Sequence, residues 1–183
     1  MNGKLSALVG ILIAMPLSAS FAQPRPQAGP QTHACQLLTG AEVGSAIGVQ
    51  PGPSQENNVV IPEGPSRGQT IAMCAWRLGP MDMVRVSIAP VLQGAQRAQG
   101  LAGLSQSFDA MKADGWKEEA KSFGDIRCSV MTPPANERDA PLMTGCMGEA
   151  KGKAVSISSI SATKQVPIDP IKDLFDKAAA RLP

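Results

Sequence analysis

Residues 71–89, IAMCAWRLGPMDMVRVSIA, contain the pattern that decides the fold. Every second residue of each half is apolar, first Cys74, Trp76 and Leu78 and then Val84, Val86 and Ile88. Because the side chains of a strand point alternately to the two faces of a sheet, this spacing predicts half-buried strands over 71–78 and 83–89. The Gly79-Pro80 pair between them is typical of a hairpin turn. The stretch therefore predicts two antiparallel strands.

Segments on both sides of this hairpin also have the composition or alternation of strands. We expect them at 58–61, 116–120, 126–131, 142–148 and 154–161. The strands come in runs joined by short turns instead of alternating with helices, which indicates a largely antiparallel sheet. The expected fold class is α+β, with a short N-terminal helix, a central helix and a C-terminal amphipathic helix packed on that sheet.

Three segments have helical signals. Thr39 and Glu42 match a capping box, so a short helix begins there. Apolar residues recur at helical spacing over 94–113, namely Ala98, Leu101, Leu104, Phe108 and Met111. They do so again near the C-terminus, at Ile171, Leu174, Phe175, Ala178 and Leu182. Asp169 is expected to cap this last helix, with Pro170 in its first position.

Two connections are rich in proline and glycine or bounded by proline. Residues 51–69 predict a long loop that is interrupted only by the brief strand at 58–61. Residues 132–141 predict a polar loop. Loops of this length are uncommon unless they have a role, so both are candidate interaction segments.

The N-terminal segment has the three parts of a secretory signal peptide. Lys4 provides the positive charge, Leu5–Leu17 is mostly apolar, and Ser20 and Ala22 are small residues that suit cleavage after Ala22. A membrane anchor is the alternative, but it needs about 20 consecutive apolar residues. We expect three segments, a signal peptide over 1–22, a Pro-rich tether over 23–34 and one domain over 35–183. The cleaved chain would be periplasmic or secreted, without a transmembrane segment.

Composition excludes nucleic acid as a partner. The chain has 17 basic and 15 acidic side chains, one histidine and 3% aromatic residues. A net charge of +2 provides no cluster of cations for a phosphate backbone. The scarce aromatic rings provide no platform on which bases could stack. The hydrophobic fraction of 43% is enough for a buried core.

The four cysteines follow the expected cleavage site. Exported compartments are oxidising, so an even number of cysteines predicts two disulfides. Four cysteines allow three pairings. We favour Cys35–Cys74 and Cys128–Cys146, because each pair lies within one half of the chain and the second could join two strands of a hairpin. A zinc or redox centre is disfavoured, since the chain has no Cys-x-x-Cys pair and a single histidine.

The other chemistry-bearing residues have ordinary explanations. His33 lies at the edge of the tether, where we expect an exposed histidine without a catalytic role. Methionine thioethers suit Cu(I), although methionine more often fills gaps in a core. The methionines after the cleavage site are Met73, Met81, Met83, Met111, Met131, Met143 and Met147. A concave pocket that collected Asp125, Arg127, Glu149 or a free thiol with a perturbed pKa would favour an enzyme. We therefore predict no catalytic residue, no cofactor and no metal site.

Several short motifs are spread over the chain, and they are Cys35-Gln36-Leu37-Leu38-Thr39-Gly40-Ala41-Glu42-Val43, Ala46-Ile47-Gly48, Cys74-Ala75-Trp76, Phe123-Gly124-Asp125 and Arg181-Leu182-Pro183. Together they resemble a group of small exported bacterial proteins and lipoproteins of unknown function with the pattern Cys-x-Leu-Leu-Thr-x-x-Glu-Val…Cys-x-Trp. The resemblance implies an α+β layout like that of PsbP and Mog-type proteins, which lack catalytic machinery. It also implies a disulfide between Cys35 and Cys74, and it implies no catalytic residue. The lipid-bearing cysteine of the lipoprotein members is absent.

Two classes of function remain. The first is a non-enzymatic exported binding or accessory protein, which would act on an envelope protein or a small ligand through a face of its sheet or through the loops at 51–69 and 132–141. The second is a periplasmic hydrolase or redox enzyme with an unrecognised site, and a Met-based copper-binding protein is a weaker alternative. We favour the first class because no residue pattern provides a nucleophile with its base or a pair of opposed carboxylates.

Overall fold

The structure is a computed structural model that describes residues 33–64, 67–137 and 139–183. The expected signal peptide over 1–22 and the tether up to residue 32 lie outside the described residues. The helices are the 3-10 helix η1 (Ala34–Gln36) and the α-helices α1 (Gly40–Ile47), α2 (Gly94–Ala113) and α3 (Ile168–Arg181). The strands are β1 (Ser54–Val60), β2 (Thr70–Arg77), β3 (Met83–Pro90), β4 (Lys117–Phe123), β5 (Ile126–Thr132), β6 (Leu142–Ala150) and β7 (Lys153–Ser161).

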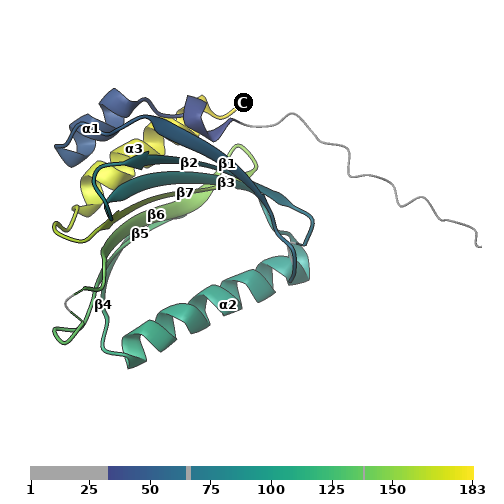
Figure 1. Cartoon of the computed structure of the whole chain (residues 1–183). Coiled ribbons are helices and arrows are strands. Elements are labelled where there is room, and N and C mark those ends of the chain that lie inside the picture. Colours follow the sequence, from purple (N-terminus) through teal and green to yellow (C-terminus); the bar gives the residue numbers. More distant parts are fainter. Residues whose placement is uncertain (1–32, 65–66, 138) are drawn as a thin grey trace, which may run out of the picture.

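The strands form one seven-stranded sheet in the order β1-β2-β3-β7-β6-β5-β4. Each neighbouring pair is antiparallel. The prediction of an α+β fold with an antiparallel sheet is therefore confirmed. The sheet is curved, and Figure 1 shows α1 and α3 on one side of it and α2 on the other.

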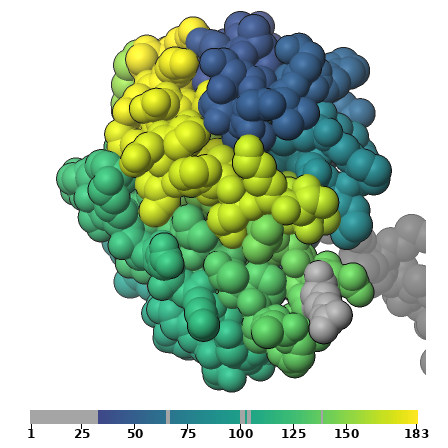
Figure 2. Space-filling view, turned by 90° about the vertical axis from the view of Figure 1, so that its left-hand side faces the viewer, coloured from purple at the N-terminus to yellow at the C-terminus, as the bar shows by residue number. Residues whose placement is uncertain are grey.

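One face of the sheet, which we call the core face, holds the hydrophobic core. Its buried side chains include Trp76 on β2, Val86 on β3 and Ile157 on β7. Helix α3 packs on β6 and β7 and buries Leu174 and Phe175 against this face. Helices α1 and α3 also contact each other, and Figure 2 shows them side by side, in blue and yellow. The core face is thus covered by helices.

Two disulfides link the elements around this core. Cys35 bonds to Cys74, which joins the segment before α1 to β2. Cys128 bonds to Cys146, its direct partner in the register of β5 and β6. These are the pairings that we favoured from the sequence. In the chain-entropy account, closing loops of 39 and 18 residues stabilises the fold by about 4 and about 3 kcal/mol.

The local sequence predicted the beginning of α1 correctly but not the beginning of α3. In α1, the Thr39 hydroxyl accepts from the backbone N–H of Glu42 at 3.2 Å, and the Glu42 carboxylate accepts from the backbone N–H of Thr39 at 2.9 Å. In α3, the residue that precedes the helix is Pro167, so the prediction that Asp169 is the cap was wrong. Pro170 is the third residue of the helix and not the first, so that prediction was wrong as well. Asp169 and Pro170 lie inside the first turn, where a proline needs no hydrogen-bond donor of its own.

The prediction of a long loop at 51–69 is partly wrong. Residues Ser54–Val60 form the edge strand β1, which pairs with β2 along its whole length from Ser54 opposite Trp76 to Val60 opposite Thr70. All seven side chains of β1 are exposed, so its sequence lacks the alternation of apolar and polar residues that would predict a half-buried strand. Backbone hydrogen bonds to β2, and not the burial of side chains, hold β1 in the sheet. The connection after β5, which we expected at 132–141, runs between Thr132 and Leu142.

Helix α2 lies where the sequence predicted a helix, but its expected packing on the sheet is not confirmed. Within the described residues, it makes no extensive contact with any strand, in contrast to α3. Of the predicted apolar stripe, Ala98 is exposed, whereas Phe108 and Met111 are half-buried. The side chains of Leu101 and Leu104 are not among those described. The sequence of α2 is rich in glycine, alanine, serine and glutamine, which offer little apolar area to bury against a sheet.

Candidate functional site

The face of the sheet opposite the core face, which we call the second face, carries the strongest candidate site. Its side chains come from the alternate positions of the strands. At its margins lie the exposed Arg77, Arg127 and Glu149. The remaining positions that we consider are Met73 and Ala75 on β2, Met83, Arg85 and Ser87 on β3, Ser156, Ser158 and Ile160 on β7, Met143, Gly145 and Met147 on β6, and Ser129 and Met131 on β5. All of them are half-buried except Met131, which is buried. This face has the opposite parity to Cys74 and Trp76, so the alternation of the strands already implies it.

Apolar side chains form a continuous row across the second face. Met131 lies opposite Met143, Met143 lies opposite Ile160, and Ile160 lies opposite Met83. This row, which we call the methionine row, crosses four strands, a span of about 14 Å at the usual spacing between strands. The cluster that forms the hydrophobic core contains no methionine among the described residues. Met131 is buried outside that cluster, and the other methionines of the row are half-buried.

The centre of the second face is small and polar, with one cation. Arg85 lies opposite Ser158 on β7 and opposite Ala75 on β2. Ser158 in turn lies opposite Gly145. Arg85 is half-buried, and no described residue forms a hydrogen bond or an ion pair with its guanidinium. Sequence reasoning missed this arginine because its environment depends on the pairing of β3 with β7.

Helix α2 is tied to the sheet by ion pairs near both of its ends. Toward its N-terminal end, Arg97 Nη2 lies 2.9 Å from Glu149 Oε1 on β6. At its C-terminal end, Lys112 Nζ lies 2.6 Å from Glu118 Oε2 on β4. The helix therefore spans the second face between these two anchors, as Figure 1 shows. Phe108 and Met111, the half-buried side chains of α2, precede the second anchor by one turn or less.

Glu118 is the more buried of the two anchors. Its side chain is 5% exposed, and its second oxygen accepts from Arg127 Nη2 at 2.7 Å. The hydrogen bonds from Lys112 and Arg127 hold the pKa of Glu118 below its usual range. Glu118 lies opposite Met131 in the register of β4 and β5. This anchor thus places the C-terminal end of α2 beside one end of the methionine row.

The residues that would have indicated an enzyme are not brought together. Arg127 pairs with Glu118, Glu149 pairs with Arg97, and Asp125 lies in the turn between β4 and β5. All four cysteines are in disulfides. Over the residues that can be described, no three His, Cys, Asp or Glu side chains are grouped as a metal site would require.

His33 has a partner that the sequence did not suggest. Its Nδ1 lies 3.3 Å from Glu56 Oε2 on β1, and its side chain is 50% exposed. The prediction of an exposed histidine agrees with this arrangement. The contact ties the start of the domain to the edge strand, and no nucleophile is described beside it.

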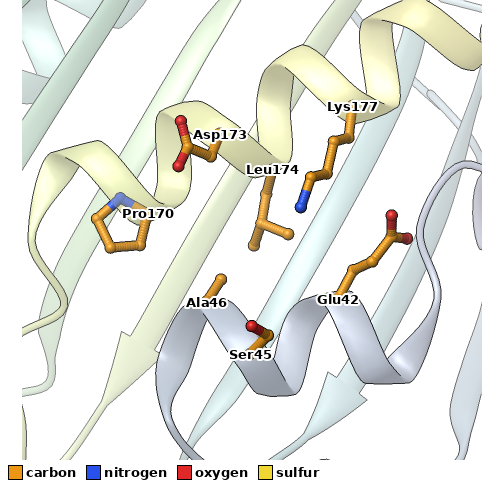
Figure 3. Close-up of a pocket in the computed structure, with 7 residues that line it drawn as sticks. All are labelled: Glu42, Ser45, Ala46, Pro170, Asp173, Leu174 and Lys177. Atoms are coloured by element: carbon orange, nitrogen blue, oxygen red, sulfur yellow. The ribbon is translucent and has the colours of Figure 1, made fainter.

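A shallow groove between α1 and α3 is the second candidate. It encloses about 230 Å³, and its lining includes Glu42, Ser45, Asp173 and Lys177. Figure 3 shows Leu174 pointing into the space between the two helices and Lys177 reaching toward α1. This volume is below the roughly 300–1,000 Å³ that is typical of ligand pockets. The groove is the seam between two packed helices, so we do not take it as the site.

Glu42 in this groove is already engaged. Arg181 donates to its two carboxylate oxygens at 2.7 and 2.8 Å, and the backbone of Thr39 donates as well. These hydrogen bonds, above all those from Arg181, lower the pKa of Glu42 to about 2. A carboxylate held in this way is a structural anion and not a proton acceptor at neutral pH.

Comparison with known proteins found no relative of this chain. No family model matches the chain, and no curated protein matches it. No helix in the described part of the chain combines the length and the apolar character that crossing a bilayer requires. The function proposed below is therefore argued from the geometry of the second face.

Proposed function

We propose that this chain is a non-enzymatic, exported binding protein that holds an elongated apolar molecule on the second face, beneath α2. The observation that carries the proposal is the methionine row, because its members other than the buried Met131 are only half-buried and lie outside the main core cluster. The row faces α2, which makes no extensive contact with a strand among the described residues. Helices α1 and α3 occupy the core face, so the second face is the one left for a ligand.

Methionine suits such a surface for a physical reason. Its unbranched side chain and polarisable sulfur adapt to ligands of different shape, and surfaces that bind several apolar partners use it for this purpose. Met131, Met143 and Met83 are spread over three strands with Ile160 between them, so an extended chain could contact all four at once. Phe108 and Met111 of α2 would cover one end of that chain.

The attachment of α2 supports access to this face. Arg97 is 52% exposed and Glu149 is 42% exposed, and an ion pair exposed to this degree contributes only about 0–1 kcal/mol. This ion pair therefore adds little to the attachment of the N-terminal end of α2 to β6. The Glu118 anchor is more buried and would act as the fixed end.

Export is proposed on two grounds. The N-terminal segment has the pattern of a cleaved signal peptide, and two disulfides persist only where thiols are oxidised. We place the protein in the periplasm or outside the cell. A small apolar molecule that crosses an aqueous compartment needs a carrier or a sensor, and both would be non-catalytic.

Binding of the neutral fluorescent probe N-phenyl-1-naphthylamine to the disulfide-intact protein tests this proposal. The wild-type chain should bind the probe with a rise in fluorescence. Met143→Gln should weaken the binding by about fivefold, because it replaces an apolar contact at the centre of the row. Met81→Gln is the matched control, since Met81 lies in the turn before β3 and is 59% exposed.

Two results would overturn the proposal. The first is no binding of the probe by the wild-type chain. The second is equal binding by wild type and by Met143→Gln, which would place the probe elsewhere on the molecule.

A Met-based copper protein is the second candidate, because Met131 and Met143 are direct cross-strand partners and bring two thioethers together. Competition for Cu(I) against a chromogenic chelator distinguishes it. Tight Cu(I) binding that Met143→Gln abolishes, with no binding of the apolar probe by the wild type, would favour copper.

A further inference from the structure

The centre of the second face contains a cation without a counter-ion. Arg85 is half-buried, and none of the described residues pairs with it. Two other cations of this face are exposed, and they are Arg127, which contacts Glu118 at 2.7 Å, and Arg77, which lies opposite Met83 at the end of β2. A guanidinium stays protonated at any physiological pH, and a partly buried charge is costly without an anionic partner. Arg85 is therefore the half-buried cation of this face for which no described residue provides a counter-ion.

The surroundings of Arg85 suit an anionic group. Its cross-strand neighbours Ser158 and Ala75 are small, and Ser87 follows on the same face of β3. Small side chains leave room for a headgroup, and serine hydroxyls can donate hydrogen bonds to it. The guanidinium fork matches a carboxylate or a phosphate with two parallel hydrogen bonds.

The apolar row begins directly beside this cation. Met83 is two residues before Arg85 on the same face of β3, a separation of about 7 Å. From Met83 the row continues through Ile160 and Met143 to Met131. A headgroup at Arg85 would thus lie at one end of a path of apolar side chains. That path ends near Glu118, the fixed anchor of α2.

We infer that the ligand of the second face is an anionic amphiphile, whose carboxylate or phosphate binds Arg85 while its alkyl chain lies along the methionine row. The inference rests on the proposed function, since it names the chemical class of the molecule that this face holds. Arg85 provides the selectivity for a negative headgroup, and the methionine side chains contact the alkyl chain of the ligand.

Three probes that share one alkyl chain test the inference. Dodecanoate, dodecyl phosphate and neutral dodecanol are titrated against the full disulfide-intact protein at about pH 7.5, in competition with N-phenyl-1-naphthylamine. At least one of the two anions should bind about tenfold or more tightly than dodecanol, as expected for charge-assisted hydrogen bonds. The preference between the two anions identifies the headgroup.

Variants of the arginine separate recognition from folding. Arg85→Gln should remove the preference for the anions and leave the affinity for dodecanol unchanged. Arg85→Lys keeps the charge but lacks the fork, so it should keep only part of the preference. Arg67→Gln is the matched control, because Arg67 lies exposed in the connection between β1 and β2. In the absence of ligand, Arg85→Gln should unfold at the same or a higher urea concentration than wild type, since it removes an unpaired charge.

The outcomes are distinct. Equal affinities of the wild-type chain for dodecanol and both anions would overturn the inference while the proposed function stands. Failure of all three probes and of the fluorescent probe to bind would overturn both. An Arg85→Gln variant that is less stable than wild type without ligand would show that the arginine has a structural role, and this would also overturn the inference.

Discussion

Replacing Glu42 with glutamine should destabilise the fold by about 1–2 kcal/mol near neutral pH. The Glu42 carboxylate closes the capping box of α1 and accepts two hydrogen bonds from Arg181 at the end of α3. Glutamine has the same size and is compatible with a capping box, so it removes mainly the charge. The substitution therefore tests the contact between two helices whose residues are 139 positions apart.

The magnitude follows from the titration of Glu42. The hydrogen bonds from Arg181 and Thr39 lower the pKa of this carboxyl from 4.5 to about 2. Each unit of pKa corresponds to about 1.4 kcal/mol, so the whole difference corresponds to about 3 kcal/mol. The Arg181 side chain is 43% exposed, and solvent screens the pair, which reduces this figure to about 1–2 kcal/mol. In a domain of this size, such a loss lowers the Tm by about 5 °C.

The pH dependence has a definite sign. Because the pKa of Glu42 is lower in the folded chain, the unfolded chain binds more protons between pH 2 and 4.5, and stability rises with pH over this range. The difference in the free energy of unfolding between wild type and Glu42→Gln should be complete above about pH 5 and should shrink as the pH falls toward about 2. Urea denaturation followed by tryptophan fluorescence at about pH 7, 4 and 2.5 measures it.

Two results would refute this reasoning. One is an equal free energy of unfolding for wild type and Glu42→Gln at about pH 7. The other is a difference that stays constant down to about pH 2.5, which would mean that the charge of Glu42 is not its source. Glu137→Gln, on the exposed connection between β5 and β6, removes the same charge and should leave the free energy of unfolding unchanged.

Three further predictions concern other parts of the molecule. Gly148→Ala would place a methyl group 3.0 Å from a side chain of β5 and 3.2 Å from one of α3, so we expect a loss of about 1–3 kcal/mol in urea unfolding, whereas Gly52→Ala, with its nearest contact at 3.6 Å, should cost less. Glu118→Gln removes the buried charge that holds the C-terminal end of α2, so amide hydrogen exchange in α2 should accelerate severalfold while exchange in α3 stays the same. Expression with secretion in a bacterial host should yield a mature chain that begins at Gln23, and Edman sequencing that finds the intact N-terminus would contradict the signal peptide.

Much of the sheet could be predicted from local patterns. The alternation of Cys74 and Trp76 on β2 and of Val84 and Val86 on β3 distinguishes a buried face from its opposite, and both strands lie within one residue or two of where the pattern places them. Only the last part of the polar strand β1 was predicted, at 58–61, because backbone pairing with β2 holds this strand while its side chains stay exposed. Helical spacing placed α2 correctly over 94–113, but periodicity alone does not measure how much apolar area a helix can bury.

The candidate site could also be predicted from the sequence only in part. The sequence alone determined which residues share the second face, because the period of a strand is two and the core residues fix its phase. Only the tertiary structure decided which of these residues are neighbours. The methionine row requires β6 to lie between β5 and β7. Arg85 has no partner among the described residues because β3 lies next to the serines of β7. The order and register of strands far apart in the chain depend on packing over the whole sheet, which no local stretch of sequence encodes.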